Sequence, residues 1–243
     1  MLQNIIIIML LITSPGDFKN DQLKHSKVKE AYAEKLAFLE KLLKSKQIDI
    51  SKLEIYIRAF KQEGLLEVWA KNKTDQKFQF LMSYDICRSS GNIGPKRKEG
   101  DMQVPEGYYF INHFNPESSY YLSLGINYPN SSDKIFADKN HPGGSIYIHG
   151  QCVTIGCLPI TDDKIKELYV LALEARNNGQ TSIPVAIFPM KMTAENMVQL
   201  KSISHSTDIW NLWMDLQMGY ENFEKQKIKP IITFLNNGRH KIE

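Results

Sequence analysis

The chain has 243 residues, 42% of them hydrophobic and 23% charged, with 30 basic and 27 acidic side chains and a net charge of +3. This composition supports a full hydrophobic core and excludes a low-complexity or disordered chain. Because the excess of positive charge is so small, no nucleic-acid partner is expected.

The N-terminal residues include an unbroken apolar run at positions 5–12. The run is too short to span a bilayer but has the length of a signal-peptide hydrophobic region, although no Lys or Arg precedes it. We therefore predict a signal peptide over residues 1–16, cleaved near Ser14 to Gly16. The protein is therefore expected to be periplasmic or secreted and associated with the cell wall, with no transmembrane span in the mature chain. The alternative is a packed or disordered hydrophobic N-terminus.

Residues 17–50 are predicted to form a helical extension. Apolar side chains recur there at steps of three and four residues among Lys and Glu, which predicts one amphipathic helix over residues 21–45.

Residues 51–192 have the pattern of a mainly β domain with one inserted helix. Predicted strands cover residues 53–60, 65–70, 78–84, 107–112, 120–126 and 183–188. Pro184 indicates that the last of these is an edge strand or begins late. The helix is expected over residues 161–177, with Thr161 as its N-cap and Gly179 just beyond its end.

Residues 193–243 form a predicted C-terminal helical extension. Trp210, Trp213 and Phe223 belong to a helical stripe rich in aromatic residues, which is expected to dock on the β domain. A partner or membrane-surface contact is the alternative. The Asn237-Gly238 dipeptide predicts a terminal hairpin.

The chemistry is expected in the stretch from His149 to Cys157. Residues 145–149 alternate as a strand buried on one face, with Tyr147 and His149 on the same side. Cys157 follows Gly156 on the turn before the inserted helix, where backbone N–H donors are available. A cysteine attacks carbonyl groups as the thiolate, and imidazole is the base whose titration fits neutral pH.

These residues resemble the signature of the L,D-transpeptidase catalytic domain (YkuD-like), in which a histidine and a spacer precede Ser/Thr-His-Gly-Cys. Here His149-Gly150 is followed by Thr154-Ile155-Gly156-Cys157, with Ile155 in place of the second histidine and Pro159 in place of the usual Arg or Asn. Together with Thr161-Asp162, this form is similar to the YafK-type branch. The resemblance extends from about residue 53 to 192 through segments 94–96, 100–109, 115–116 and 127–129.

The resemblance implies a mixed β-sandwich or barrel-like fold and a set of roles. Cys157 is the expected acylating nucleophile and His149 the general base, with the Gly150 carbonyl orienting the histidine. The N–H groups of Gly156 and Cys157 are the expected oxyanion hole. No metal or cofactor is implied.

Substrate recognition needs other residues, because Pro159 stands where the family has a carboxylate-binding side chain. Lys96 or Arg88 is expected to serve instead. Tyr147 is expected either to contact substrate or to pack in the core. The segment Lys96-Arg97-Lys98 is itself interpreted as an exposed loop.

The implied reaction is acyl transfer on peptidoglycan stem peptides through a thioester on Cys157, as in an L,D-transpeptidase. One alternative is an amidase that hydrolyses a peptidoglycan cross-link or a lipoprotein anchor, which would make a wall-anchored lipoprotein a partner. A second is a non-catalytic wall-binding protein, which the departures at Ile155 and Pro159 keep open.

Two other uses of the cysteines remain as alternatives. His149, Cys152 and Cys157 would make only three zinc ligands, one short of a structural site. A disulfide between Cys152 and Cys157, or from Cys87 to either, is disfavoured because three cysteines are an odd number. Of the other histidines, His25, His205 and His240 are expected to face solvent, while His113 and His141 are expected at the surface or lining the cleft.

Overall fold

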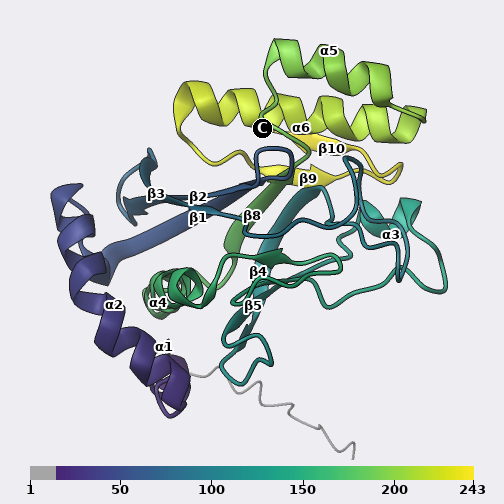
Figure 1. Ribbon diagram of the computed structural model, residues 1–243. Helices are drawn as coiled ribbons and strands as arrows, with labels where there is room; N and C mark the ends of the chain where they lie inside the picture. Colours follow the sequence, from purple (N-terminus) through teal and green to yellow (C-terminus); the bar gives the residue numbers. More distant parts are fainter. Residues whose placement is uncertain (1–14) are drawn as a thin grey trace, which may run out of the picture.

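A computed structural model describes residues 15–243 and shows one mixed sheet with helices on both faces (Figure 1). The apolar run at 5–12 and almost all of the predicted signal peptide lie outside the described residues. The sheet has eight strands in the order β3-β2-β1-β8-β4-β5-β6-β7. Their bounds are β1 Leu53–Phe60, β2 Leu65–Asn72, β3 Gln79–Asp85, β4 Gly107–Asn115, β5 Ser123–Ile126, β6 Tyr147–His149, β7 Leu158–Pro159 and β8 Ile183–Phe188.

Alternation along β1 supplies side chains to two cores, one on each face of the sheet. Ile55 and Ile57 are buried in the first core, whereas Tyr56 and Phe60 are buried in the second. The first core lies under α4 (Asp162–Asn177), on which α1 (Pro15–Gln22) and α2 (Ser26–Ser45) pack in turn. The second lies under α5 (Ala194–Ile203) and α6 (Thr207–Gln226), above the sheet in Figure 1. The predicted mainly β fold with an inserted helix and flanking helices is confirmed.

The predicted single helix over residues 21–45 is wrong, because the chain breaks between α1 and α2. His25 has extended backbone angles and its Nδ1 lies 2.6 Å from Glu117 Oε1, on the loop after β4. Backbone bonds from the N–H groups of Lys24 and His25 close a turn there, before α2 begins at Ser26.

Of the two alternatives that Pro184 suggested for the last strand, the edge position is wrong, since β8 lies between β1 and β4 in the middle of the sheet. Pairing with β1 begins only at Val185, opposite Ile57. Two residues earlier along β1, the side-chain amide of Gln180 bonds both the N–H and the C=O of Ile55, at 2.9 and 2.8 Å. A side chain therefore pairs with β1 before the ladder begins, and Pro184 is tolerated without a backbone N–H.

The C-terminal segment docks on the β domain as expected and ends in the predicted hairpin of β9 (Ile232–Phe234) and β10 (His240–Ile242). Trp213 of α6 is buried and its Nε1 donates to Glu106 Oε2 at 2.8 Å. Glu106 also accepts from Lys61 Nζ at 2.8 Å, which ties α6 to the loop after β1. His240 is not solvent-facing as predicted, because β10 packs it between the rings of Tyr108 and Phe234.

The α3 turn (Asp133–Phe136) and η1 (Ile50–Lys52) complete the described elements. Within residues 15–243, none of the helices combines the length and the apolar character needed to cross a bilayer. The proposed division at residues 16, 50 and 192 stays a prediction.

Candidate active site

Two short strands at the end of the sheet carry His149 and hold Cys157 two residues away in register. In β6, His149 pairs with Ser123 of β5 on one side and with Pro159 of β7 on the other. Because Ile148 pairs with Leu158, Cys157 lies one step before β7, next to Tyr147. The Tyr147 N–H donates to Cys157 Sγ at 3.4 Å. Parallel pairing of β6 with β7 therefore brings the predicted base and nucleophile to one edge of the sheet.

The His149 ring is buried and held in one orientation. Its exposed fraction is 1%, and Nδ1 lies 2.5 Å from the Gly150 carbonyl oxygen, to which it donates as Nδ1–H. The Tyr120 ring covers it at a centroid distance of 4.7 Å. Burial lowers the pKa of His149, and the bond to Gly150 opposes this effect. The neutral ring thus carries its basic lone pair on Nε2.

Cys157 carries the free thiol of the described chain and is half-buried. Its Sγ lies 3.7 Å from the Ser145 carbonyl oxygen, to which the S–H donates. Burial raises the pKa of Cys157, while the Tyr147 N–H and the charge of Lys96 act in the opposite direction. Because the thiol form is favoured at neutral pH, a base is needed to make the nucleophile. No hydrogen bond joins His149 to Cys157 within residues 15–243, and such pairs often tighten only when substrate binds.

The expected oxyanion hole is occupied by a side chain of the chain itself. Thr154 Oγ1 accepts from the N–H of Gly156 at 3.2 Å and from the N–H of Cys157 at 2.8 Å. The same hydroxyl donates to the Cys157 carbonyl at 2.9 Å. The two N–H groups are thus engaged in this conformation, and Thr154 would have to turn aside before they bind an oxyanion.

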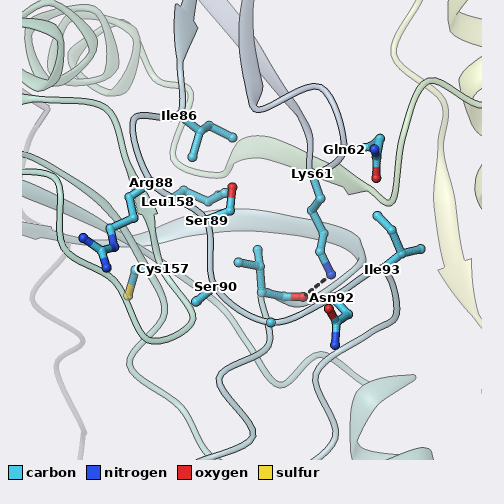
Figure 2. Close-up of a pocket in the computed structure, with 12 residues that line it drawn as sticks. Lys61, Gln62, Ile86, Arg88, Ser89, Ser90, Asn92, Ile93, Cys157 and Leu158 are labelled. Carbon is cyan, nitrogen blue, oxygen red and sulfur yellow. Dashed lines mark hydrogen bonds between the residues drawn. The ribbon is translucent and has the colours of Figure 1, made fainter.

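A cleft of about 340 Å³ opens beside the thiol. Its walls come from Cys157 and Leu158, from the loop after β1 and from the segment that follows β3, as Figure 2 shows. Arg88 of that segment is exposed and lies at the same end of the pocket as Cys157. It also borders a second hollow of about 280 Å³ with Tyr120, Val153 and Ile155. Arg88 forms no ion pair with any residue in the part of the chain that the structure describes.

Lys96 does not lie in an exposed position as predicted, because it is 4% exposed. Its Nζ donates to Asp101 Oδ1 at 2.6 Å and to the Lys98 carbonyl at 2.9 Å. These bonds close the loop on itself and leave Lys96 poorly placed to hold a substrate carboxylate. Tyr147 is half-buried, and its ring contacts His113 edge-on at 6.3 Å.

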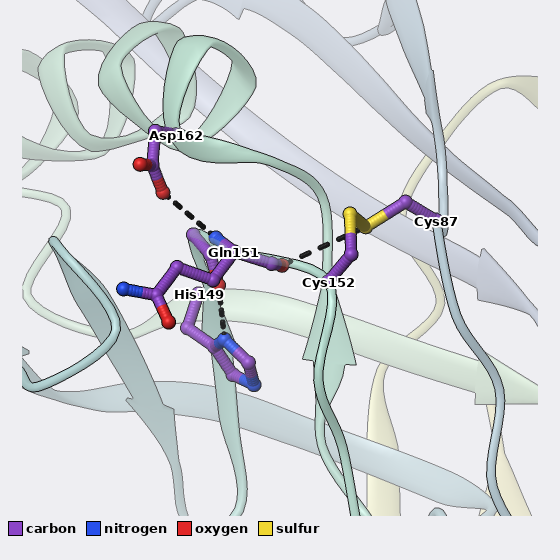
Figure 3. Close-up of a disulfide and its surroundings, with 6 residues drawn as sticks. Cys87, His149, Gln151, Cys152 and Asp162 are labelled. Atoms are coloured by element: carbon purple, nitrogen blue, oxygen red, sulfur yellow. Dashed lines mark hydrogen bonds between the residues drawn. A yellow bond between two sulfur atoms is a disulfide. The ribbon is translucent and has the colours of Figure 1, made fainter.

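A disulfide joins Cys87 to Cys152, with Cα atoms 5.6 Å apart (Figure 3). The prediction against a disulfide is therefore wrong, because the odd cysteine is Cys157 and it stays free. The zinc alternative loses Cys152 as a ligand, and no cluster of three metal-binding side chains occurs among residues 15–243. The bridge ties the Arg88 segment to the loop between His149 and Cys157.

The sequence prediction missed the contact of Asp162. Its Oδ1 accepts from the Gln151 N–H at 2.7 Å, whereas Thr161, the predicted N-cap, makes no capping bond with its side chain. A Cβ at Gly150 would lie 2.4 Å from Asp162 Oδ1 and 2.7 Å from the Tyr120 carbonyl oxygen. Only glycine fits there. The signal in the sequence was Thr161-Asp162, interpreted only as the start of a helix.

A cysteine and a buried histidine held by a backbone carbonyl, at the edge of a mixed sheet, define a candidate cysteine acyl-transfer site. Residues 54–187 match the YkuD family, described as the L,D-transpeptidase catalytic domain, and the chain belongs to that family.

Among curated proteins, the chain is similar to the putative L,D-transpeptidase YafK of Escherichia coli strain K12. The two are 37% identical over 188 residues, which cover 76% of this chain and 72% of the relative. The protein of the same name from E. coli O157:H7 matches equally. The resemblance to the YafK-type branch is confirmed.

Solved structures give weaker likenesses. The helical cell shape determining protein Pgp2 from Campylobacter jejuni is 18% identical with a TM-score of 0.45, over 76% of this chain and 74% of that one. Bd1075 of Bdellovibrio bacteriovorus is 18% identical with a TM-score of 0.41, over 75% and 77%. Scores this low support no inference about function.

Proposed function

We propose that the protein is a cysteine-dependent L,D-transpeptidase that acts on peptidoglycan stem peptides through a thioester on Cys157. One observation carries the proposal. The free thiol of Cys157 opens into a cleft, and the neighbouring strand carries the buried imidazole of His149, which the Gly150 carbonyl holds in place. Membership of the family and the 37% identity to a putative L,D-transpeptidase support it.

In the proposed reaction, His149 Nε2 takes the thiol proton and Cys157 Sγ attacks a stem-peptide carbonyl. The C–N bond breaks, and the leaving amine takes the proton from the imidazolium of His149. An amine of a second stem peptide then attacks the thioester and gives its proton to His149. The new amide forms as Cys157 leaves as the thiolate, which regains that proton.

Arg88 is the proposed carboxylate-binding residue. It is exposed in the cleft next to the thiol and has no acidic partner among residues 15–243, so its guanidinium is available to a stem-peptide carboxylate. We prefer Arg88 to Lys96 for this role, because Lys96 Nζ already bonds Asp101 and the Lys98 carbonyl.

A periplasmic or secreted location is part of the proposal. The Cys87–Cys152 disulfide supports it, because such bonds form and persist in oxidising compartments. The peptidoglycan substrate requires the same location.

The test is mass spectrometry of the products formed from purified sacculi and stem tetrapeptides, with Cys157→Ala as the matched variant. Cys157-dependent loss of a terminal D-alanine together with new peptide dimers is the expected result. Cys157-dependent release of cross-linked or anchored material without dimers would replace the transpeptidase by an amidase. Identical products from both proteins would overturn catalysis and favour the wall-binding alternative.

A further inference from the structure

The peptide group between Gly150 and Gln151 connects His149 to a carboxylate. Its carbonyl oxygen accepts from His149 Nδ1 at 2.5 Å, and its N–H donates to Asp162 Oδ1 at 2.7 Å. Figure 3 shows both bonds, with the backbone of Gln151 between the two side chains. The peptide group is one conjugated, planar unit. A negative charge at its N–H end therefore increases the electron density on its oxygen, as in other polarised hydrogen-bond chains.

We propose that Asp162 is a positioning residue for His149, acting through the Gly150–Gln151 peptide group rather than by direct contact. The carboxylate polarises the peptide so that its oxygen holds Nδ1–H more strongly. That bond keeps Nε2 as the unprotonated nitrogen and stabilises the imidazolium formed after proton transfer. The inference rests on the proposed role of His149 as the general base.

The backbone has an uncommon conformation at both ends of the bond from the Gln151 N–H to Asp162. Gln151, the donor, has a φ of 57°, and Thr161, the residue before the acceptor, has a φ of 72°. For residues other than glycine, such angles are unfavourable and persist only where the surroundings impose them. The disulfide at Cys152 holds the next residue of the loop. The arrangement is thus specified by several independent constraints.

Among the groups around His149, Asp162 supplies the carboxylate that is connected to the ring through this peptide group. Tyr120 covers the ring from the loop before β5, Cys157 lies beside β6, and Arg88 lines a hollow together with Tyr120. The next residue along, Asp163, turns away to Lys35 and Lys164. Asp163 is therefore a matched control, with the same charge on the same turn of α4.

The experiment compares the full-length protein with the variants Asp162→Asn, Asp162→Ala and Asp163→Asn. Asn is isosteric and its Oδ1 still accepts from the Gln151 N–H, so Asp162→Asn removes the charge while keeping the bond. The His149 ring is followed by nitrogen-15 NMR, which reports tautomer and titration without substrate, and turnover is measured on stem tetrapeptides. Thermal unfolding of each variant checks the fold.

For Asp162→Asn we expect the His149 titration to move down by about 0.5 pH unit, a several-fold loss of kcat and an unchanged KM. Asp163→Asn should match the unsubstituted protein in all three. The inference is overturned if Asp162→Asn leaves the His149 titration and tautomer unchanged while only Asp162→Ala loses turnover, since a purely geometric role needs no charge. Because the titration needs no substrate, it tests Asp162 even if Cys157→Ala shows the proposed function to be wrong.

Discussion

The Cys87–Cys152 bridge should contribute strongly to the stability of the fold. The two cysteines are 65 positions apart, and cross-linking a loop of that length removes unfolded-chain entropy worth about 4 kcal/mol at 25 °C. Both residues are exposed, so replacing them by serine removes little buried contact. Against a typical total of about 5–15 kcal/mol, losing the bridge should remove a large share of the free energy of unfolding.

The assay is urea unfolding of Cys157→Ala, which cannot exchange thiols, against the triple variant that also carries Cys87→Ser and Cys152→Ser. The triple variant should be less stable by about 4 kcal/mol. A reductant should destabilise the single variant by a similar amount and leave the triple variant unchanged. A difference below about 1 kcal/mol would refute the entropic reasoning, because it lies well outside the usual range for a native bridge. With Cys157 restored, loss of the bridge should also lower turnover, since it frees the Arg88 segment.

Two further predictions concern Arg88 and His240. Arg88→Gln should raise KM for stem peptides about tenfold, because a charge-assisted hydrogen bond to the substrate is lost. Lys98→Gln, at another exposed position, should leave KM unchanged. Equal KM values for the two variants in steady-state kinetics would contradict the role of Arg88. Burial lowers the pKa of His240 to about 4, against 6.5 in the unfolded chain, even though Asp215 opposes this effect. The folded state therefore binds this proton more weakly, and stability should fall as the pH drops from 6.5 towards 4, by about 3 kcal/mol at most. The measurement is urea unfolding at pH 7 and at pH 4. On acidification His240→Phe should lose less stability than the unsubstituted protein, whereas the exposed His205→Gln should lose as much as that protein does. If His240→Phe lost as much stability in acid as the unsubstituted protein, the lowered pKa of His240 would be contradicted.

Local pattern was sufficient to predict the elements that frame the site. Apolar, strand-like runs located β1 and β8 to the residue, and helical spacing located α4 and α6. Asn237-Gly238 located the terminal hairpin. The family was recognisable for the same reason, because His149 and Cys157 lie eight residues apart and their motif can be read within one short stretch. The roles of these two side chains stay predictions until Cys157→Ala is tested.

Tertiary contacts decided the features that depend on residues far apart in the chain. Position along the sequence does not show that Cys87 meets Cys152, or that Lys96 is buried against Asp101 rather than free in an exposed loop. His240 has a polar sequence environment, yet the docking of β10 buries it. Pro184 is accepted in a central strand because the nearby Gln180 pairs with Ile55, which is distant in the sequence.

The same division holds inside the site. The sequence by itself determined which residue types are present and the strand that ends at His149, but not β7, the short strand that follows Cys157. Only the folded chain decided that Thr154 occupies the expected oxyanion donors and that Asp162 reaches the peptide group beside His149. The physical reason is that secondary structure follows from spacing along the chain, whereas hydrogen-bond partners and burial follow from how separate elements pack.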